Sequence, residues 1–216
     1  MLSINGTPLS RVESTKFLGV YVDQHMTWKD HIKSISSKIA KNTGIIARTA
    51  HILPPSIRLK LYYSLIYPYL AYCNLVWAST YTTRLQRLIT LQKRVIRIVT
   101  GTTYGSHTNP LFFNFKVLKL EQLRLFQIGE FMYKYDRGLL PPVYKGFFNL
   151  ASEVHSHLTR NSVNYRSVFA RSNTRQFSIK SIGATTWNKI PQEIRKSPSL
   201  TLFKIKLRTY LVEGNY

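Results

Sequence analysis

The chain has 216 residues, of which 44% are hydrophobic, enough for a packed core in one large or two small domains. Lys and Arg number 31 against 9 Asp and Glu, so the formal net charge is +22. Such a charge is typical of proteins that bind an acidic polymer. The apolar run from Leu65 to Ala78 contains Pro68 and Asn74 and is shorter than the roughly 20 residues that span a bilayer. We therefore interpret it as a buried helix and expect no membrane span.

The start of the chain and its cysteine content indicate the cellular compartment in which the protein is expected. A secretory signal has a basic start, an apolar run and a small-residue cleavage site, whereas this chain opens with Met1-Leu2-Ser3-Ile4-Asn5-Gly6. Cys73 is the single cysteine, so it has no internal disulfide partner and fits a reducing compartment. We expect an intracellular protein that is not secreted, with nucleus and cytoplasm equally open and the oligomeric state undefined.

Strand signals are concentrated in residues 1–27. Asn5-Gly6 is a strong hairpin turn between two short apolar runs, and the segment from Phe17 to Val22 is rich in β-formers. We expect a small β unit here. Because the chain begins on half a hairpin, the sequence also suggests truncation.

A helical period begins at Trp28. Four isoleucines fall within about 60° of one another on a helical wheel: Ile32, Ile35, Ile39 and Ile46. Three basic residues face the opposite way: Lys33, Lys41 and Arg48. The pattern predicts an amphipathic helix with one buried and one basic face.

Two further helices are expected before residue 101. Pro54-Pro55 ends the first helix and opens the second, whose apolar spacing at Ile57, Leu61 and Leu65 continues to a kink or break at Pro68. The third covers Tyr81 to Val99 and stops at Gly101. Its apolar face holds Leu85, Leu88, Ile89, Val95, Ile96 and Val99. Its basic face holds Arg87, Arg94 and Arg97, supported by Lys93.

Patterns after residue 101 are weaker. Residues 101–113 are rich in turn formers, residues 118–135 have a helical pattern, and residues 138–142 interrupt it. Residues 151–178 show little periodicity, and a final helix is expected over 200–211. His155 and His157 could form half of a metal site, but Glu153 is their only nearby carboxylate, so we interpret them as surface residues.

Several segments together resemble one protein family. Lys16-Phe17-Leu18-Gly19-Val20, with Asp23 and Met26-Thr27-Trp28 behind it, is similar to the palm–thumb junction of non-LTR retrotransposon reverse transcriptases, where the primer grip lies. Residues 183–191 and 202–204 are similar to the ending of these proteins, and residues 111–120 and 131–141 to their post-thumb region. The segments occur in the family's order. The chain thus resembles the C-terminal region of a LINE, jockey-like polymerase, with primer grip, thumb and post-thumb.

The resemblance implies a mainly α-helical fold in three parts. Residues 1–27 would be a palm remnant with a primer-grip-like strand, residues 28–103 a helical thumb-like bundle, and residues 104–216 a partly helical extension. Phe17, Leu18 and Gly19 would position the primer end, because glycine lets a nucleic-acid backbone approach closely. The residues alone instead favour a bulge at Gly19 and core packing for the other two.

The basic helical faces are the second candidate site. They are expected to bind RNA, DNA or an RNA–DNA template–primer duplex, because cations can contact successive phosphates without reading sequence. The residues concerned are Lys33, Lys41, Arg48, Arg87, Lys93, Arg94 and Arg97. Simple solvation of these faces is the alternative. Five tyrosines could stack on bases, although helix packing is the interpretation we favour: Tyr62, Tyr63, Tyr67, Tyr69 and Tyr72.

DNA synthesis requires carboxylates that hold two metal ions about 4 Å apart. The isolated Asp23, Asp30 and Asp136 do not replace a paired Asp motif. We expect no polymerase activity from this chain alone and no cofactor in it, because magnesium would belong to a missing palm. Two other functions remain open. One is a free-standing basic protein, derived from such an element, that coats RNA or binds acidic partners. The other is membrane-surface association through basic amphipathic helices.

Overall fold

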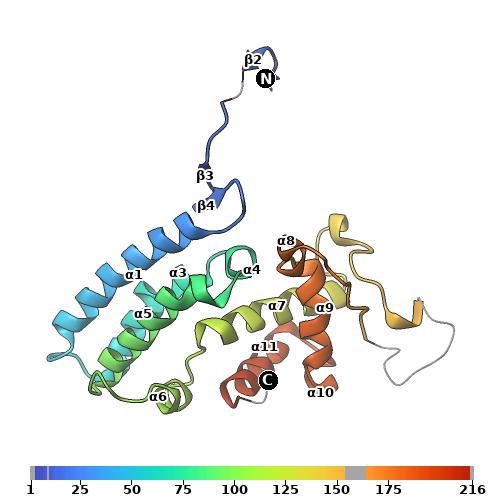
Figure 1. Ribbon diagram of the computed structural model, residues 1–216. Coiled ribbons are helices and arrows are strands. Elements are labelled where there is room, and N and C mark those ends of the chain that lie inside the picture. Colours follow the sequence, from blue (N-terminus) through green and yellow to red (C-terminus); the bar gives the residue numbers. More distant parts are fainter. Residues whose placement is uncertain (1–2, 9, 154–163, 215–216) are drawn as a thin grey trace.

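The computed structural model describes residues 3–8, 10–153 and 164–214. The described chain is mainly α-helical, as predicted, and has two small antiparallel hairpins near its beginning (Figure 1). The strands are β1 (Ser3–Ile4), β2 (Thr7–Pro8), β3 (Ser14–Phe17) and β4 (Val20–Asp23). The helices are α1 (Lys29–Thr49), α2 (Pro55–Leu65), α3 (Tyr67–Ala71), α4 (Asn74–Trp77), α5 (Thr82–Thr100), α6 (Asn109–Asn114), α7 (Leu120–Asp136), α8 (Asn173–Gln176), α9 (Ile179–Lys189), α10 (Gln192–Arg195) and α11 (Leu200–Val212). Two 3-10 helices, η1 (Pro142–Tyr144) and η2 (Ala151–Glu153), lie between α7 and α8.

Both hairpins close through two-residue turns in the left-handed backbone region. Asn5 and Gly6 join β1 to β2 with φ of 49° and 79°, which confirms the predicted turn. Leu18 and Gly19 join β3 to β4 with φ of 45° and 84°. Two successive positive φ values match the twist of a hairpin. The β-rich segment from Phe17 to Val22 is thus a strand end, a turn and a second strand, and Gly19 is a turn residue rather than a bulge.

The two long helices of the N-terminal half match the sequence pattern. The four isoleucines predicted to be buried on α1 are buried, and so is the apolar face of α5, except that Ile89 is half-buried. Gly101 ends α5 in the left-handed conformation with φ of 73°, as predicted. The helices pack side by side and start at the same end, next to β4 and α4 (Figure 1).

The buried face of α2 differs from the prediction by one residue. Ile57 is exposed, whereas Arg58 and Tyr62 are buried. The Arg58 Nη1 donates to the Ile98 carbonyl oxygen at 2.6 Å, close to the C-terminal end of α5, where the helix dipole favours a cation. The apolar spacing missed this face because an arginine occupies one of its positions.

Residues 65–78 do not form the single buried helix suggested by their composition. Pro68 lies in the first turn of α3, so the break predicted there is present. A second break follows at Cys73, whose φ of 49° separates α3 from α4. The buried Trp77 side chain donates through Nε1 to the Tyr72 carbonyl oxygen at 2.7 Å and so holds α4 against this break.

α7, α9 and α11 form a second group of helices, in which α7 packs against both others. α7 and α11 lie where the sequence predicted helices, whereas α9 and α10 were not predicted. Two glycines permit the close packing. A Cβ atom on Gly129 of α7 would lie 2.6 Å from the Leu207 Cδ2, and one on Gly183 of α9 would lie 2.9 Å from the Met132 Sδ. A larger residue at either position would displace these neighbouring side chains from their present packing.

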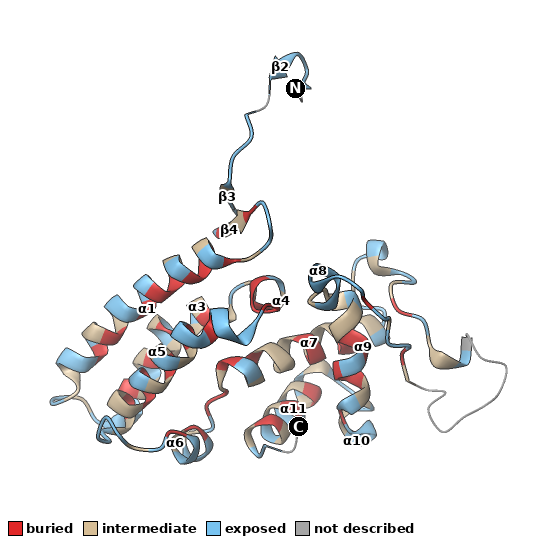
Figure 2. Cartoon of the chain, in the orientation of Figure 1, coloured by how far each residue is buried: buried red, intermediate tan, exposed pale blue. Residues whose placement is uncertain are grey.

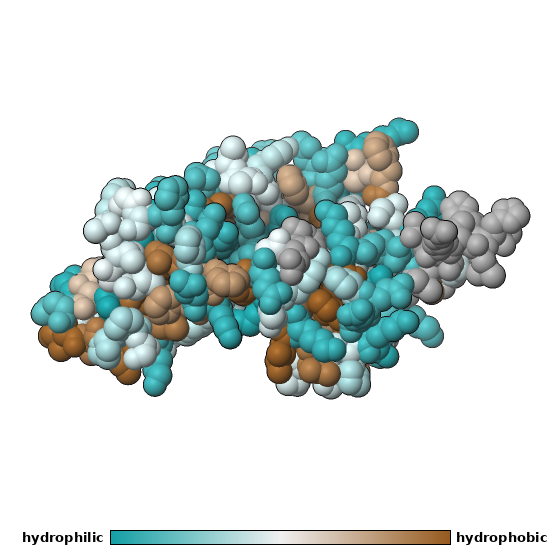
Figure 3. Space-filling model, turned by 90° about the horizontal axis from the view of Figure 1, so that it is seen from below, coloured by the Kyte–Doolittle hydropathy of each residue, from teal (hydrophilic) through white to brown (hydrophobic). Residues whose placement is uncertain are grey.

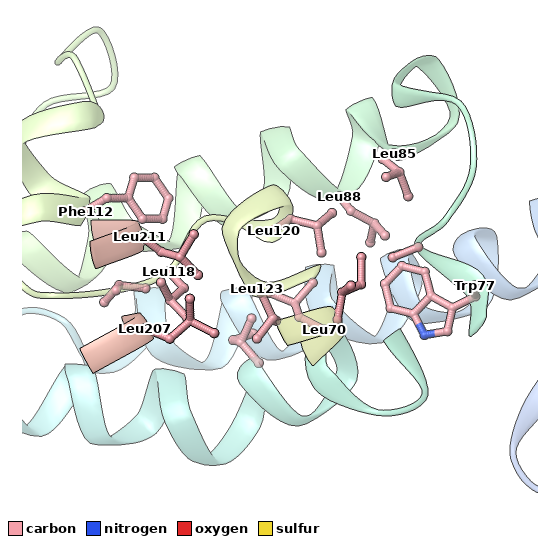
Figure 4. Packing of buried hydrophobic residues seen from close by; sticks show 14 of the residues in the cluster. Leu70, Trp77, Leu85, Leu88, Phe112, Leu118, Leu120, Leu123, Leu207 and Leu211 are labelled. Carbon is pink, nitrogen blue, oxygen red and sulfur yellow. The ribbon is translucent and has the colours of Figure 1, made fainter. Parts of the chain in front are cut away.

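Buried residues, red in Figure 2, occur on the helices of both groups. Their hydrophobic side chains belong to one core cluster. Figure 4 shows part of it, where leucines from α3, α5, α7 and α11 point toward one another beside Trp77 of α4 and Phe112 of α6. Burial of these side chains is the main force that holds the two groups together.

A buried glutamine also joins the two groups. Gln92 of α5 donates through Nε2 to the Tyr62 hydroxyl at 3.0 Å and to the Leu118 carbonyl oxygen at 2.9 Å. Its Oε1 accepts the backbone N–H of Leu120 at 2.9 Å. The polar groups at this junction are therefore paired, as buried polar groups must be. The domain boundary expected at 103–104 remains a prediction.

Candidate nucleic-acid interface

Charge is distributed unevenly along the folded chain. No Asp or Glu occurs between Asp30 and Glu121. α1 carries Lys29, Lys33, Lys38, Lys41 and Arg48, and α5 carries Arg84, Arg87, Lys93, Arg94 and Arg97. The ion pairs found in the described part of the chain have their carboxylates on α7, at Glu130 and Asp136. Among the residues described, the basic residues of α1 and α5 thus form no internal ion pair.

The N-terminal ends of α1 and α5 enclose a groove of about 530 Å³. Lys29 and Lys33 line it from α1, and Arg84 and Arg87 line it from α5; we call this site the basic groove. The other lining residues are Glu13, Asp23, Gln24, His25, Thr27, Asp30 and Ile32. The fold therefore brings together Lys33 and Arg87, two residues predicted to contact phosphate.

Two basic residues of the groove were missed from the sequence. Lys29 precedes Lys33 by four residues, and Arg84 precedes Arg87 by three. Both spacings place side chains on one face of a helix, so the signal was present in the pattern.

Asp23 fixes the loop that forms one wall of the basic groove. Its buried carboxylate accepts the backbone N–H groups of His25 at 3.2 Å, Thr27 at 2.9 Å and Trp28 at 2.6 Å. Burial acts to raise the pKa of Asp23, but the hydrogen bonds to the ionised form outweigh it, and the pKa is lowered. The Thr27 carbonyl oxygen accepts from the Arg84 Nη1 at 2.8 Å, which attaches the loop to α5. The hydrogen bonds to the Asp23 carboxylate explain why Asp23 lies a few residues before Met26-Thr27-Trp28 in the sequence.

Other predicted basic residues lie outside the basic groove. Lys41 and Arg48 are exposed on α1, about 12 and 22 Å beyond Lys33 at 1.5 Å per residue. Arg94 is exposed on α5, and Lys93 next to it is half-buried. The predicted residues are therefore spread along α1 and α5 and are not confined to the basic groove. Their contact with phosphates remains a prediction.

Arg97 has an internal role that the sequence did not indicate. Its Nε donates to the Ser106 carbonyl oxygen at 2.9 Å, and its guanidinium lies 5.8 Å from the centre of the Tyr104 ring. Cations over aromatic rings are stabilised by the ring quadrupole. Arg97 thus holds the loop that follows α5.

The tip of the second hairpin projects into solvent. Phe17 and Leu18 are 66% and 73% exposed, so the interpretation that they fill a core is wrong. Tyr72, at the end of α3, donates its hydroxyl to the Leu18 carbonyl oxygen at 2.6 Å. Its ring lies 3.6 Å from the position of a Cβ atom on Gly19. The tip is therefore held against α3 while its apolar side chains stay accessible, and the role in gripping a primer remains a prediction.

The tyrosine series serves mainly to pack helices, as favoured above. Tyr62 is fully buried, and burial raises its pKa. The Tyr62, Tyr63 and Tyr67 rings contact one another in succession, with centroids 5.3 and 5.4 Å apart. Tyr69 is half-buried beneath the Lys38 ammonium. Tyr72 is the exposed member, and its contact is with the hairpin tip.

Acidic and histidine side chains do not gather into a metal-type cluster within the described residues. The Asp23 oxygens accept hydrogen bonds from backbone N–H groups, and Asp136 accepts a hydrogen bond from the Tyr165 hydroxyl at 2.9 Å. His155 and His157 lie outside the described residues.

The surface seen from below the view of Figure 1 is mostly hydrophilic. Hydrophobic residues appear on this face as small separate groups (Figure 3). Across the residues that the structure describes, every helix is too short or too polar to cross a bilayer.

Comparison with known proteins finds polymerases of mobile elements. The RNA-directed DNA polymerase from mobile element jockey of Drosophila funebris is 28% identical over 142 residues, which are 64% of this chain and 15% of that protein. Part of the chain is therefore similar to the jockey-like RNA-directed DNA polymerases. This similarity supports the resemblance to the C-terminal part of a non-LTR retrotransposon reverse transcriptase.

Two more members of this polymerase family show the same similarity. The jockey polymerase of Drosophila melanogaster is 26% identical over 123 residues, or 55% of this chain and 13% of that protein. The probable RNA-directed DNA polymerase from transposon X-element of the same species is 26% identical over 102 residues, or 45% of this chain and 11% of that protein. The match thus spans a small part of each polymerase. No family model and no solved structure matches the chain.

Proposed function

We propose that this chain binds a template–primer duplex without sequence preference, as the C-terminal portion of an RNA-directed DNA polymerase. The basic groove carries this proposal. Four cations from two helices line one cavity, where they outnumber the three carboxylates of Glu13, Asp23 and Asp30. Three of the four cations also lie in the stretch between Asp30 and Glu121, which has no acidic residue. Cations so placed bind phosphate oxygens of either strand, because the backbone charge of a nucleic acid is independent of its sequence.

The hairpin tip extends the proposal toward the primer. Phe17 and Leu18 are exposed on a turn that Tyr72 holds in place, so an apolar surface can rest against the sugars of a primer end without losing its position. Accurate placement of the reacting hydroxyl contributes strongly to catalysis in a complete enzyme. The tip would therefore affect extension more than overall affinity.

Binding without synthesis is the second part of the proposal. Two-metal catalysis needs carboxylates that converge on one point. The described residues do not fit this requirement, because their acidic, histidine and cysteine side chains form no cluster of three or more that could hold a metal ion. The Asp23 oxygens accept from backbone N–H groups, and Asp136 accepts from the Tyr165 hydroxyl. Magnesium and nucleotides would be held by a palm domain of the same polymerase. We expect no primer extension by the purified chain.

The test removes three charges from the basic groove. The variant Lys29→Gln, Lys33→Gln, Arg87→Gln leaves Arg84 intact, because Arg84 anchors the loop at Thr27. Duplex affinity is measured over a range of salt concentrations. Each lost phosphate contact flattens the slope of log affinity against log salt by about 0.9 for duplex DNA, so we expect a slope flatter by about two to three units.

The matched control removes the same net charge from exposed residues elsewhere: Lys145→Gln, Lys196→Gln and Lys206→Gln. Circular dichroism checks that both variants are folded. The groove variant should lose affinity for unrelated sequences, and the control should lose little. Equal losses would mean that net charge alone drives binding and that the basic groove is not the site.

A further inference from the structure

An exposed aromatic ring lies at the opposite end of α5 from the basic groove. Tyr104 is 83% exposed, in the loop between α5 and α6. An exposed aromatic ring does not gain the stability that burial usually gives it. Phe112 on the following helix α6, by contrast, is buried.

The loop around Tyr104 is held by several hydrogen bonds. The Arg97 Nε donates to the Ser106 carbonyl oxygen at 2.9 Å, the Ser106 N–H donates to the Thr103 carbonyl oxygen at 3.1 Å, and the two hydroxyls of Thr103 and Ser106 lie 2.9 Å apart. The Thr102 N–H donates to the Arg97 carbonyl oxygen at 3.1 Å. The ring is therefore presented on an ordered loop.

One face of the Tyr104 ring is occupied and the other is open. The Arg97 guanidinium lies 5.8 Å from the ring centre, and the exposed fraction leaves the opposite face to solvent. A planar group that stacks on the open face would complete a layer of guanidinium, phenol and ligand. The sequence has no Asp or Glu between Asp30 and Glu121, so α5 and the loop that carries Tyr104 add no negative charge of their own.

We propose that the open face of Tyr104 stacks on an unpaired base of single-stranded nucleic acid. Base–aromatic stacking is sequence-tolerant, because every base has a π-face, and arginine adds to it. Along α5, Gly101 lies about 21 Å from Arg87 at 1.5 Å per residue. This is roughly the length of six stacked nucleotides at 3.4 Å each. A strand whose duplex part rests in the basic groove could therefore reach Tyr104 with a single-stranded extension.

This inference rests on the proposed function, and it is tested with the purified chain and two fluorescent probes. One probe is a blunt duplex. The other is the same duplex with an overhang of about ten nucleotides, longer than the ~21 Å along α5, with 2-aminopurine at successive overhang positions. Stacking on Tyr104 should quench 2-aminopurine at one or two of these positions.

The substitutions separate stacking from simple contact. Tyr104→Ala should lower affinity for the overhang probe about tenfold, within the range of one base–aromatic stack, and should abolish the quenching. Tyr104→Phe should bind like the unaltered chain, whereas Tyr104→Leu should bind like Tyr104→Ala because it has no aromatic face. Phe169→Ala is the matched control, since Phe169 is also 83% exposed and lies far away in the sequence.

The outcomes distinguish this inference from the proposed function. Blunt-duplex affinity should be the same in all four variants, because the basic groove is intact. If the unaltered chain binds both probes and Tyr104→Ala or Tyr104→Leu binds the overhang equally well, the stacking site is wrong and the proposed function stands. If the unaltered chain binds neither probe, the proposed function fails and this inference fails with it.

Discussion

Replacement of Asp23 by asparagine tests whether the motif around it builds the wall of the basic groove. Asparagine keeps one oxygen for the N–H groups of His25 and Thr27, but it turns an N–H₂ group toward the Trp28 N–H, which now donates to the carboxylate at 2.6 Å. The substitution therefore removes one charge-assisted hydrogen bond and weakens two others. Hydrogen bonds to charged groups contribute about 1.5–3 kcal/mol each, against about 1 kcal/mol for neutral ones.

We expect Asp23→Asn to lower the free energy of unfolding by about 2–4 kcal/mol at neutral pH, for the loss of one such bond and the weakening of two. Urea unfolding followed by circular dichroism measures this value. The effect should also depend on pH. Because the folded pKa of Asp23 is lowered, its contribution is complete above the unfolded pKa of about 3.9 and is lost as pH falls through the folded pKa. The variant and the unaltered chain should therefore converge in stability toward acid.

Duplex binding gives a second, independent readout. Glu13→Gln, at an exposed residue of the same groove, removes the same charge without disturbing the loop. On charge alone, removal of a carboxylate from a basic groove should raise duplex affinity. We expect Glu13→Gln to bind slightly more tightly and Asp23→Asn to bind more weakly. The reasoning is refuted if Asp23→Asn unfolds like the unaltered chain and binds like Glu13→Gln.

Two other contacts make sharp predictions. Gln92→Met should lower the free energy of unfolding, measured in urea, by at least about 2 kcal/mol, because it leaves the buried Leu120 N–H and two further polar groups unpaired. The control Gln86→Met, at an exposed residue, should change the free energy of unfolding by no more than about 0.5 kcal/mol. Similar values for both variants would mean that Gln92 does not stabilise the junction between the two helical groups. Tyr72→Phe removes the 2.6 Å hydrogen bond to Leu18 and should speed amide hydrogen exchange in the hairpin about fivefold, for a loss of about 1 kcal/mol of local stability. Unchanged exchange would mean that the tip does not depend on Tyr72.

The helices with strong apolar periodicity could be predicted from the sequence alone. α1 and α5 lie close to their expected ranges, because burial of one face drives each of them and that face recurs every three to four residues. α7 and α11 also lie close to their expected ranges, although their patterns are weaker. The turn at Asn5-Gly6 and the end of α5 at Gly101 were equally predictable, since few residues other than glycine and asparagine adopt positive φ easily. The excess of positive charge and the family resemblance also came from the sequence.

Other features depend on contacts between residues far apart in the chain. Arg58 is buried because the carbonyl end of α5 lies above it, and Leu18 adopts positive φ in a turn that Tyr72 holds. α9 escaped prediction because its helix packs through Gly183, a residue that opposes helix formation locally.

The candidate site also has features that the sequence determines and features that only the tertiary structure decides. The sequence determined which helices are basic, since each face can be read from its own spacing. It could not determine that the N-terminal ends of α1 and α5 meet, because that depends on how two buried faces pack together. The tertiary structure alone placed Lys33 and Arg87 in one groove and directed Arg97 to the loop that carries Tyr104. Local patterns fix the face of a helix, whereas only packing fixes its neighbours.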